Sequence, residues 1–411
     1  MNLDTILNFF SLKTHPFRKM TFDELSELYV SMMLRSLAMS MSGIFIPIFL
    51  YHLNYKIWQI LLYYFIVFGT QYLFAIPSAK TVAKIGPKHT IMISYLMQIL
   101  TLIALIFLKD MPYLFAYSAI VLGIANISFF TSFHIDFSKV KHKETGGREL
   151  GLVYLGERLG AVLGPVIGGL VAFIFGPKFI FLAAILVLIS AVIPLFLTKE
   201  PTRLNQDLMY QDLSFKKIKR DVISYSFFTV EAAVSMIIWP LFLGVFVFYK
   251  NPYIQLGSIM SISIIVSLIV ARVYGKLIDN YQGRNLLRFS ASSNAVLHMF
   301  RVFTNGFTGA LGINLVNEVI TPGYKMPTFK GMYDAADSYP GHRIVYISVM
   351  EVFSSMSRMI FFGLATVSAY YFQTGRPFFA ILFSVGAICS LLMMVEKYPA
   401  LNSKKFRLWP L

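Results

Sequence analysis

Residues 178–198 read KFIFLAAILVLISAVIPLFLT, and Lys178 is the one charged side chain in this run. An α-helix rises 1.5 Å per residue, so about 20 apolar residues span the roughly 30 Å hydrocarbon core of a bilayer. Apolar runs of similar length recur along the whole chain. We therefore expect membrane-spanning helices, because transmembrane strands would be about 10 residues long and would alternate in polarity.

The composition supports this interpretation. Of the 411 residues, 57% are hydrophobic and 14% are charged, whereas soluble domains carry about 25% charged residues. Too few polar groups are present to cover a water-facing surface. The single cysteine, Cys389, excludes an intrachain disulfide framework and a cysteine-cluster metal site. We expect no cleavable signal peptide, because a charged leader precedes the first apolar run.

The polar breaks between apolar runs predict an all-α polytopic membrane protein of about twelve transmembrane helices. The expected spans are 29–51, 57–78, 89–108, 112–137, 149–175, 178–198, 222–249, 254–278, 286–304, 307–327, 343–372 and 377–395.

The basic residues are distributed unequally between the two sides of this topology. Of the 36 lysines and arginines, 25 fall on the side of the termini, 5 on the opposite side and 6 inside spans. By the positive-inside rule both termini are cytoplasmic, and the plasma (inner) membrane is the expected location. The rule also explains the net charge of +16 without a nucleic-acid partner.

The two halves of the chain share landmarks. Pro47 and Pro240 each lie late in the first span of a half, and Gly147 with Glu157 recurs as Gly341 with Glu351, 194 residues later. This repeat predicts two pseudo-symmetric six-helix bundles. The expected segments are a cytoplasmic N-terminal segment 1–28, a bundle 29–198, a cytoplasmic linker 199–221, a bundle 222–395 and a cytoplasmic tail 396–411.

Span 5 contains the stretch GAVLGPVIGG at residues 160–169, with Gly160, Gly164, Pro165, Gly168 and Gly169 at fixed spacing. Small residues four apart let helices approach closely, and a proline removes one backbone hydrogen bond. The stretch resembles the G-x-x-x-G-P-x-x-G-G motif of antiporter-type exporters of the major facilitator superfamily. Plain helix packing and a coupling role are both open readings of it.

The same resemblance extends to the loops that follow the second span of each half. Residues 275–284, GKLIDNYQGR, resemble the superfamily's G-x-L-x-D-x-x-G-R-K signature with one extra residue, whereas Ala83 replaces the acid in the first copy. The resemblance implies a cytoplasmic gate formed by Gly275, Asp279, Gly283 and Arg284. A tight turn with solvated charges is the alternative.

Ionisable residues inside spans are costly and usually face a cavity or a partner. In span 11, Glu351, Ser354, Ser355 and Arg358 form a stripe along one helical face. Glu351 and Arg358 are about 10 Å apart along the axis, so each needs another partner. The stripe therefore predicts a cavity wall, with Glu351 as a proton-coupling candidate and Ser354 and Arg358 as substrate-cavity candidates.

Three further charges complete the candidate site. Glu157 shares a helical face with Gly164 and Gly168, where desolvation would favour its protonated form and a proton-coupling role; the alternative is an orienting pair with a basic neighbour. Arg35 and Glu231 lie in the first spans of the two halves. They are expected either to face a shared cavity, with Glu231 carrying protons and Arg35 contacting substrate, or to form a salt bridge.

Four weaker polar patterns accompany these charges. Asp136 ends a polar stripe in span 4 and is a substrate-cavity candidate or an interfacial charge, and His134 is one more possible proton carrier. Glu318 and Lys325 share a face of span 10. A further stripe in span 9 consists of Ser290, Asn294, His298 and Arg301.

No zinc-protease, nucleophile-elbow or phosphate-loop pattern occurs in the sequence. We therefore expect no enzymatic activity, no cofactor, no metal and no ATP-driven pumping. The leading hypothesis is a monomeric secondary transporter that works by alternating access and uses protons to export a small organic solute. The alternatives are a lipid or lipid-linked sugar translocase, an intramembrane enzyme, and a non-transporting scaffold or sensor.

Overall fold

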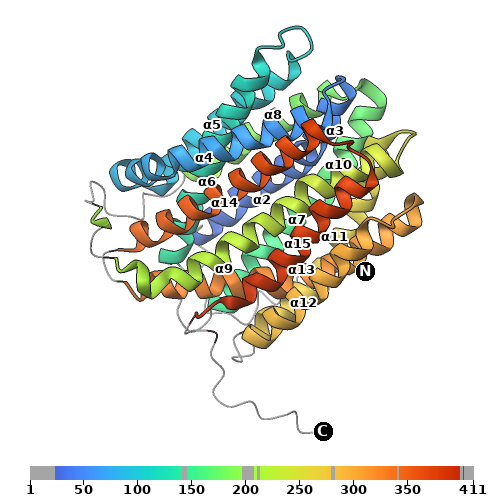
Figure 1. Cartoon of the computed structure of the whole chain (residues 1–411). Coiled ribbons are helices and arrows are strands. Elements are labelled where there is room, and N and C mark those ends of the chain that lie inside the picture. Colours follow the sequence, from blue (N-terminus) through green and yellow to red (C-terminus); the bar gives the residue numbers. More distant parts are fainter. Residues whose placement is uncertain are drawn as a thin grey trace, which may run out of the picture.

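The computed structural model describes residues 24–140, 146–196, 208–210, 213–278, 283–339, 342–398 and 401. Within them the secondary structure is helical throughout, with no strand. Helices satisfy every backbone hydrogen bond internally, as a bilayer requires. Long helices run side by side along one direction (Figure 1).

The first half of the chain forms six helical stretches, each of which covers one expected span. They are α2 (Glu24–Ser42) continued by η2 (Gly43–Phe45) and α3 (Ile46–His52), α4 (Ile57–Ile85), α5 (Pro87–Ile106), α6 (Leu114–Val140), α7 (Gly146–Phe175), and α8 (Lys178–Val192) with η3 (Ile193–Phe196).

The second half also forms six stretches. They are α9 (Phe215–Ala233) continued by η5 (Val234–Ile238), α10 (Trp239–Phe242) and η6 (Leu243–Val247), α11 (Pro252–Leu277), α12 (Gly283–Arg301), α13 (Gly306–Asp337), α14 (Arg343–Tyr371), and α15 (Arg376–Leu392) with η8 (Met393–Val395).

The prediction of an all-α polytopic membrane protein of about twelve helices is confirmed. Ten stretches in the described part of the chain are long and apolar enough to cross a membrane. The other two, α12 and α13, correspond to the expected spans 286–304 and 307–327. Both carry charged and amide side chains that lower their hydropathy, and Asn294, Arg301, Asn314 and Glu318 among them are buried.

Both landmark prolines begin a new helical segment after a departure from α geometry. Pro47 is in the first turn of α3, directly after the 3₁₀ turn η2, and Pro240 is in the first turn of α10, directly after the π-helical η5. A proline has no N–H for the α-helical hydrogen bond, so the preceding turn tightens or widens. Each half therefore departs from α geometry just before the landmark proline of its first span, by a tightened turn in the first half and a widened turn in the second.

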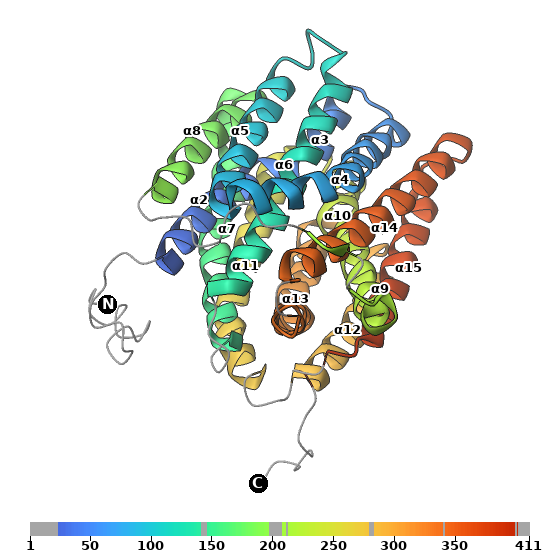
Figure 2. The same cartoon turned by 90° about the vertical axis from the view of Figure 1, so that its left-hand side faces the viewer.

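The most extensive contacts between the first half and the second are made by two pairs of helices. Figure 2 shows α2, α5, α7 and α8 on one side and α9, α12, α14 and α15 on the other. Across this division α7 packs against α11, and α4 packs against α14. The geometry of a site on α7, α4 or α14 therefore depends on how the two halves are placed relative to each other.

The glycine motif of span 5 lies on the two faces of α7 that pack against α2 and against α11. A β-carbon at Gly160, Gly164 or Gly168 would collide with the backbone of α2 or with its side chains, and one at Gly169 would collide with the backbone of α11. On the α11 side, a β-carbon at Gly257 would meet the Pro165 carbonyl oxygen. Small residues thus bring the α7 backbone against α2 and against α11.

We call the end of the bundle where α4 ends and α5 begins the basic end, because the loops with most lysines and arginines lie there. At the opposite end, aromatic side chains of α4 meet those of α14. The ring centroids of Trp58 and Tyr370 are 5.3 Å apart, and those of Tyr64 and Phe362 are 5.5 Å apart. The halves are therefore in contact at this end.

Candidate functional site

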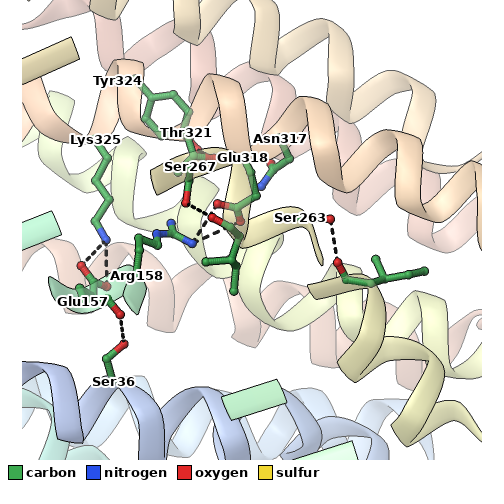
Figure 3. Close-up of polar contacts among 12 residues, drawn as sticks. Ser36, Glu157, Arg158, Ser263, Ser267, Asn317, Glu318, Thr321, Tyr324 and Lys325 are labelled. Carbon is green, nitrogen blue, oxygen red and sulfur yellow. Dashed lines mark hydrogen bonds and ion pairs between the residues drawn. The ribbon is translucent and has the colours of Figure 1, made fainter. Parts of the chain in front are cut away.

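Two ion pairs connect α7 of the first half to α13 of the second (Figure 3). The Lys325 Nζ lies 3.2 Å from both carboxylate oxygens of Glu157. The Arg158 NH1 lies 3.0 Å from Glu318 Oε2 and 3.3 Å from Glu318 Oε1. We call these four residues the α7–α13 cluster. Its charges sum to zero, and each helix contributes one acid and one base.

The α7–α13 cluster is only partly shielded. The side chains of Lys325 and Glu157 are 19% and 29% exposed, and those of Arg158 and Glu318 are 14% and 10% exposed. The Ser36 hydroxyl on α2 donates to the Glu157 carbonyl oxygen at 2.6 Å, which fixes this turn of α7 against its own half. The sequence-based alternative for Glu157, a pair with a basic residue, matches this geometry; the structure adds that the partner belongs to the other half.

A second group of polar side chains surrounds Glu351 on α14. The Tyr225 hydroxyl of α9 donates to Glu351 Oε1 at 2.9 Å, and His134 Nε2 of α6 lies 3.6 Å from the same oxygen. The other ring nitrogen of His134 is 2.7 Å from the Tyr333 hydroxyl of α13. We call these four residues the His134 cluster. His134 is its member from the first half, so this contact also joins the halves.

The predicted stripe on α14 lies on one face, as the spacing required. The Ser354 hydroxyl is 3.4 Å from Glu351 Oε2, and Arg358 NH2 is 3.3 Å from the Ser354 hydroxyl. Arg358 also donates to the Ser355 hydroxyl at 3.3 Å. Its guanidinium carbon lies 4.7 Å from the centroid of the Phe68 ring on α4. Ser354 thus bridges the acid and the base, and Arg358 reaches the first half through a cation–π contact.

Glu231 lies in a third group, which belongs entirely to the second half. Its Oε1 accepts hydrogen bonds from the Ser235 hydroxyl at 2.7 Å and Asn294 Nδ2 at 2.8 Å, and lies 3.1 Å from His298 Nε2. The Tyr324 hydroxyl donates to Oε2 at 3.0 Å. We call these five residues the Glu231 cluster. Its carboxylate is fully buried and held by α12, α13 and the π-helical turn after α9.

The remaining predicted residues occupy separate places. Arg35 makes no ion pair with Glu231 within the described part of the chain; its guanidinium carbon lies 3.4 Å from the centroid of the Phe129 ring on α6. Asp136 is buried near the basic end of α6. Arg284 binds Glu396, with Nε 2.7 Å from Oε1. Asp279, its expected gate partner, lies outside the described residues.

For several members of these clusters, the sequence gave a weak signal of a role in the site or none at all. Glu318 and Lys325 share a face of span 10, and this is the signal that could have paired them with span 5. Asn294 and His298 belonged to a recognised stripe, but nothing in the sequence assigned that stripe to Glu231. Tyr225 and Tyr333 gave no signal, because a tyrosine in an apolar helix is ordinarily a packing residue.

Charged side chains inside membrane spans commonly mark substrate or ion pathways, and here they lie on contacts between two helical halves. The family model described as Major Facilitator Superfamily matches residues 28–317. The chain therefore belongs to this superfamily, as the span 5 motif and the loop after span 8 predicted.

Individual proteins agree with this assignment. The proton-coupled antiporter flippase LtaA of Staphylococcus aureus is 24% identical over 320 residues, covering 74% of this chain and 78% of LtaA. A bacterial homologue of the iron transporter ferroportin, in an outward-facing state, has a TM-score of 0.67 at 15% identity, covering 91% of this chain and 98% of that one. The E. coli fucose:proton symporter FucP has a TM-score of 0.65 at 14% identity, covering 90% and 97%. The two structures show a shared fold.

Proposed function

We propose that this chain is a proton-coupled secondary transporter that exports a small organic solute by alternating access of its two halves. The observation that carries the proposal is the placement of two acids, Glu157 and Glu351, on contacts between the halves. Each has a basic or titratable partner from the opposite half, Lys325 for the first and His134 for the second.

This placement links proton binding to the arrangement of the halves. Protonation of Glu157 removes the negative charge that holds Lys325, so the contact between α7 and α13 weakens. Glu351 also lies on a contact between the halves, because its Oε1 is 3.6 Å from His134 Nε2 of α6. A state that separates α7 from α13 therefore binds a proton on Glu157 more tightly than the state described here, by linkage. A proton gradient can then shift the balance between the two states.

A second candidate, translocation of a lipid or a lipid-linked sugar on the same fold, is favoured by the similarity to LtaA, named as a proton-coupled antiporter flippase. Both candidates use the same coupling residues and differ in the cargo. We place the cargo beside Ser354 and Arg358, whose hydroxyl and guanidinium groups can donate hydrogen bonds to a solute or a headgroup that carries acceptors.

The test is proton movement in proteoliposomes challenged with drugs, amino acids, sugars, lysolipids and glycolipids. Wild type is compared with Glu157→Gln and Glu351→Gln, and with Asp334→Asn as a matched control. Asp334 pairs with Lys330 four residues away on the same helix, with its Oδ2 2.9 Å from the lysine Nζ, and it belongs to neither the α7–α13 cluster nor the His134 cluster.

We expect a compound that triggers proton flux in the wild type and in Asp334→Asn, and little flux in the other two variants. The class of that compound separates solute export from lipid translocation. Flux that survives both substitutions would reject the two acids as coupling residues. Transport of a compound without proton movement would reject proton coupling itself.

A further inference from the structure

An apolar groove runs along the outside of the second half between α14 and α15. Its volume is about 660 Å³, within the range of about 300–1,000 Å³ typical of ligand sites. Both helices pack against α9. They make little contact with each other, although α15 directly follows α14 in the chain. Phe227 and Val230 of α9 contribute to the groove lining, which fits a floor formed by that helix.

The lining is almost entirely apolar. It includes Phe361, Leu382 and Val385, and at its deep end the buried Cys389. Ser357 also lines the groove, but its hydroxyl donates to the Phe353 carbonyl oxygen at 2.8 Å and needs no water. Water in such a groove would lack hydrogen-bond partners. An empty groove would leave its wall atoms without dispersion contacts, so an apolar occupant is favoured.

The groove is open to the surface that faces the hydrocarbon. Its strongly exposed residues include Ile360 at 50%, Leu364 at 66% and Ile381 at 64%. They continue the apolar outer surface of α14 and α15, on which Val367 and Ile388 are also exposed. The hydrocarbon of the bilayer therefore has direct access to the groove.

The groove is long enough to hold one acyl chain. Its lining runs along α14 from Ser357 and ends at Phe372, the residue directly after the helix and 15 positions further on, about 22 Å at 1.5 Å per residue. One leaflet of a bilayer contributes roughly 15 Å of hydrocarbon, half of the whole core. The groove starts at the end opposite the basic end, beside Gln373 and Pro377, and so reaches past the depth of one leaflet.

We propose that this groove holds one acyl chain of a resident bilayer lipid from the leaflet opposite the basic end. The lipid is a bound component and not the transported cargo, because the groove lies outside the contacts between the halves. Phe361 lines the groove, while its neighbour Phe362 stacks on Phe68 of α4 at 5.2 Å. The acyl chain thus supports the helix that carries Glu351 and Arg358.

The test uses phosphatidylcholine with a diazirine in one acyl chain, reconstituted with the full-length protein and photolysed. Mass spectrometry then measures the labelling of each helix. We expect labelling within residues 357–389 to exceed that of the exposed face of α8 by about tenfold, which corresponds to about 1.4 kcal/mol of preference.

Two variants fill the groove, and one is a control. Ala365→Trp fills it from a buried wall position, and Leu364→Trp fills it from the exposed rim without disturbing the core. Leu186→Trp on α8 changes the same residue type at nearly the same exposure, 63%. We expect the enrichment to fall to that of α8 in either filled variant and to persist in Leu186→Trp.

Equal labelling of α8 and of the groove in the wild type would overturn the proposal. Enrichment that persists in a correctly folded Leu364→Trp would overturn it as well. Neither result depends on proton coupling, so the groove and the proposed transport function fail separately.

Discussion

The contact between Glu157 and Lys325 offers the sharpest quantitative test, because it joins the two halves and is only partly buried. At 3.2 Å and an effective dielectric constant of about 20, the attraction between unit charges is about 5 kcal/mol before desolvation. Desolvation and screening cancel most of this, and fully exposed pairs retain about 0.2–1 kcal/mol. With side chains 19% and 29% exposed, we expect a coupling of about 1–2 kcal/mol, a factor of roughly 5–30 in an equilibrium.

A double-mutant cycle measures this coupling. Glu157→Gln, Lys325→Gln and the double variant are compared with wild type, each carrying spin labels at Lys84→Cys and Ser338→Cys in a Cys389→Ser background. Both label sites are exposed and lie at the basic end, one in each half. The distance distribution between the labels gives the populations of the contacting and separated states.

Each single substitution should raise the separated population about 5- to 30-fold, and the double variant should show less than the sum of the two effects. The physical reason is that either change already removes the attraction, so the second has little left to remove. Additivity within about 0.3–0.5 kcal/mol would refute the reasoning, because it would mean that the pair does not hold the halves together.

Three further predictions follow from other contacts. Gly257→Leu should lower the melting temperature, because overpacking between α7 and α11 costs about 1–3 kcal/mol of stability. Gly156→Ala should leave the melting temperature unchanged, since a β-carbon there meets nothing within 4 Å. Equal melting temperatures for the two variants would contradict the close contact. Glu231→Gln should lower the transition temperature in a thermal-shift assay, because the new amide N–H group would face hydrogen-bond donors that now bind a carboxylate oxygen. An unchanged transition temperature would show that the Glu231 cluster does not stabilise the fold. Arg284→Gln should speed limited proteolysis after α15, because Glu396 then loses a partner at 2.7 Å, and cleavage at the wild-type rate would count against this anchor.

The sequence was sufficient for the fold because the bilayer restricts the possible structures so strongly. A run such as residues 178–198 has to become a helix, since no other backbone conformation satisfies its hydrogen bonds in hydrocarbon. The glycine spacing in span 5 also predicted close helix contacts, because a missing side chain has a direct geometric consequence. Both inferences depend on local sequence alone.

The site could be predicted only in part. Contacts between helices depend on how each helix is rotated about its axis and on which helices pack next to it, and the sequence of a single helix shows neither. The α14 stripe was predictable, since Glu351, Ser354 and Arg358 lie on one helix. The partner of Glu157 was not, because Lys325 is 168 residues away and comes from the other half. The position of Glu231 was equally hidden: the turn that follows it is π-helical, which rotates the rest of that span relative to a regular helix.

Glu157 and Glu231 are suited to different tasks, and the surroundings of each carboxylate indicate which. A contact that opens in every cycle has to be weak, and the pair of Glu157 with Lys325 is partly open to solvent. Glu231 accepts hydrogen bonds from Ser235, Asn294 and Tyr324 and is fully buried. Stripping those donors from a buried carboxylate would cost about 1–3 kcal/mol for each group left unsatisfied.

All partners of Glu231 in its cluster move with the second half, so its protonation does not by itself change any contact between the halves. We therefore infer that Glu157 and Glu351 are better placed than Glu231 to couple protons to the motion. The role that the geometry favours for Glu231 is to hold α9, α12 and α13 as one body. Proton flux distinguishes these roles: a Glu231→Gln protein that remains folded should retain coupled transport, whereas folded Glu157→Gln should lose it. Loss of coupling in folded Glu231→Gln would reverse this assignment.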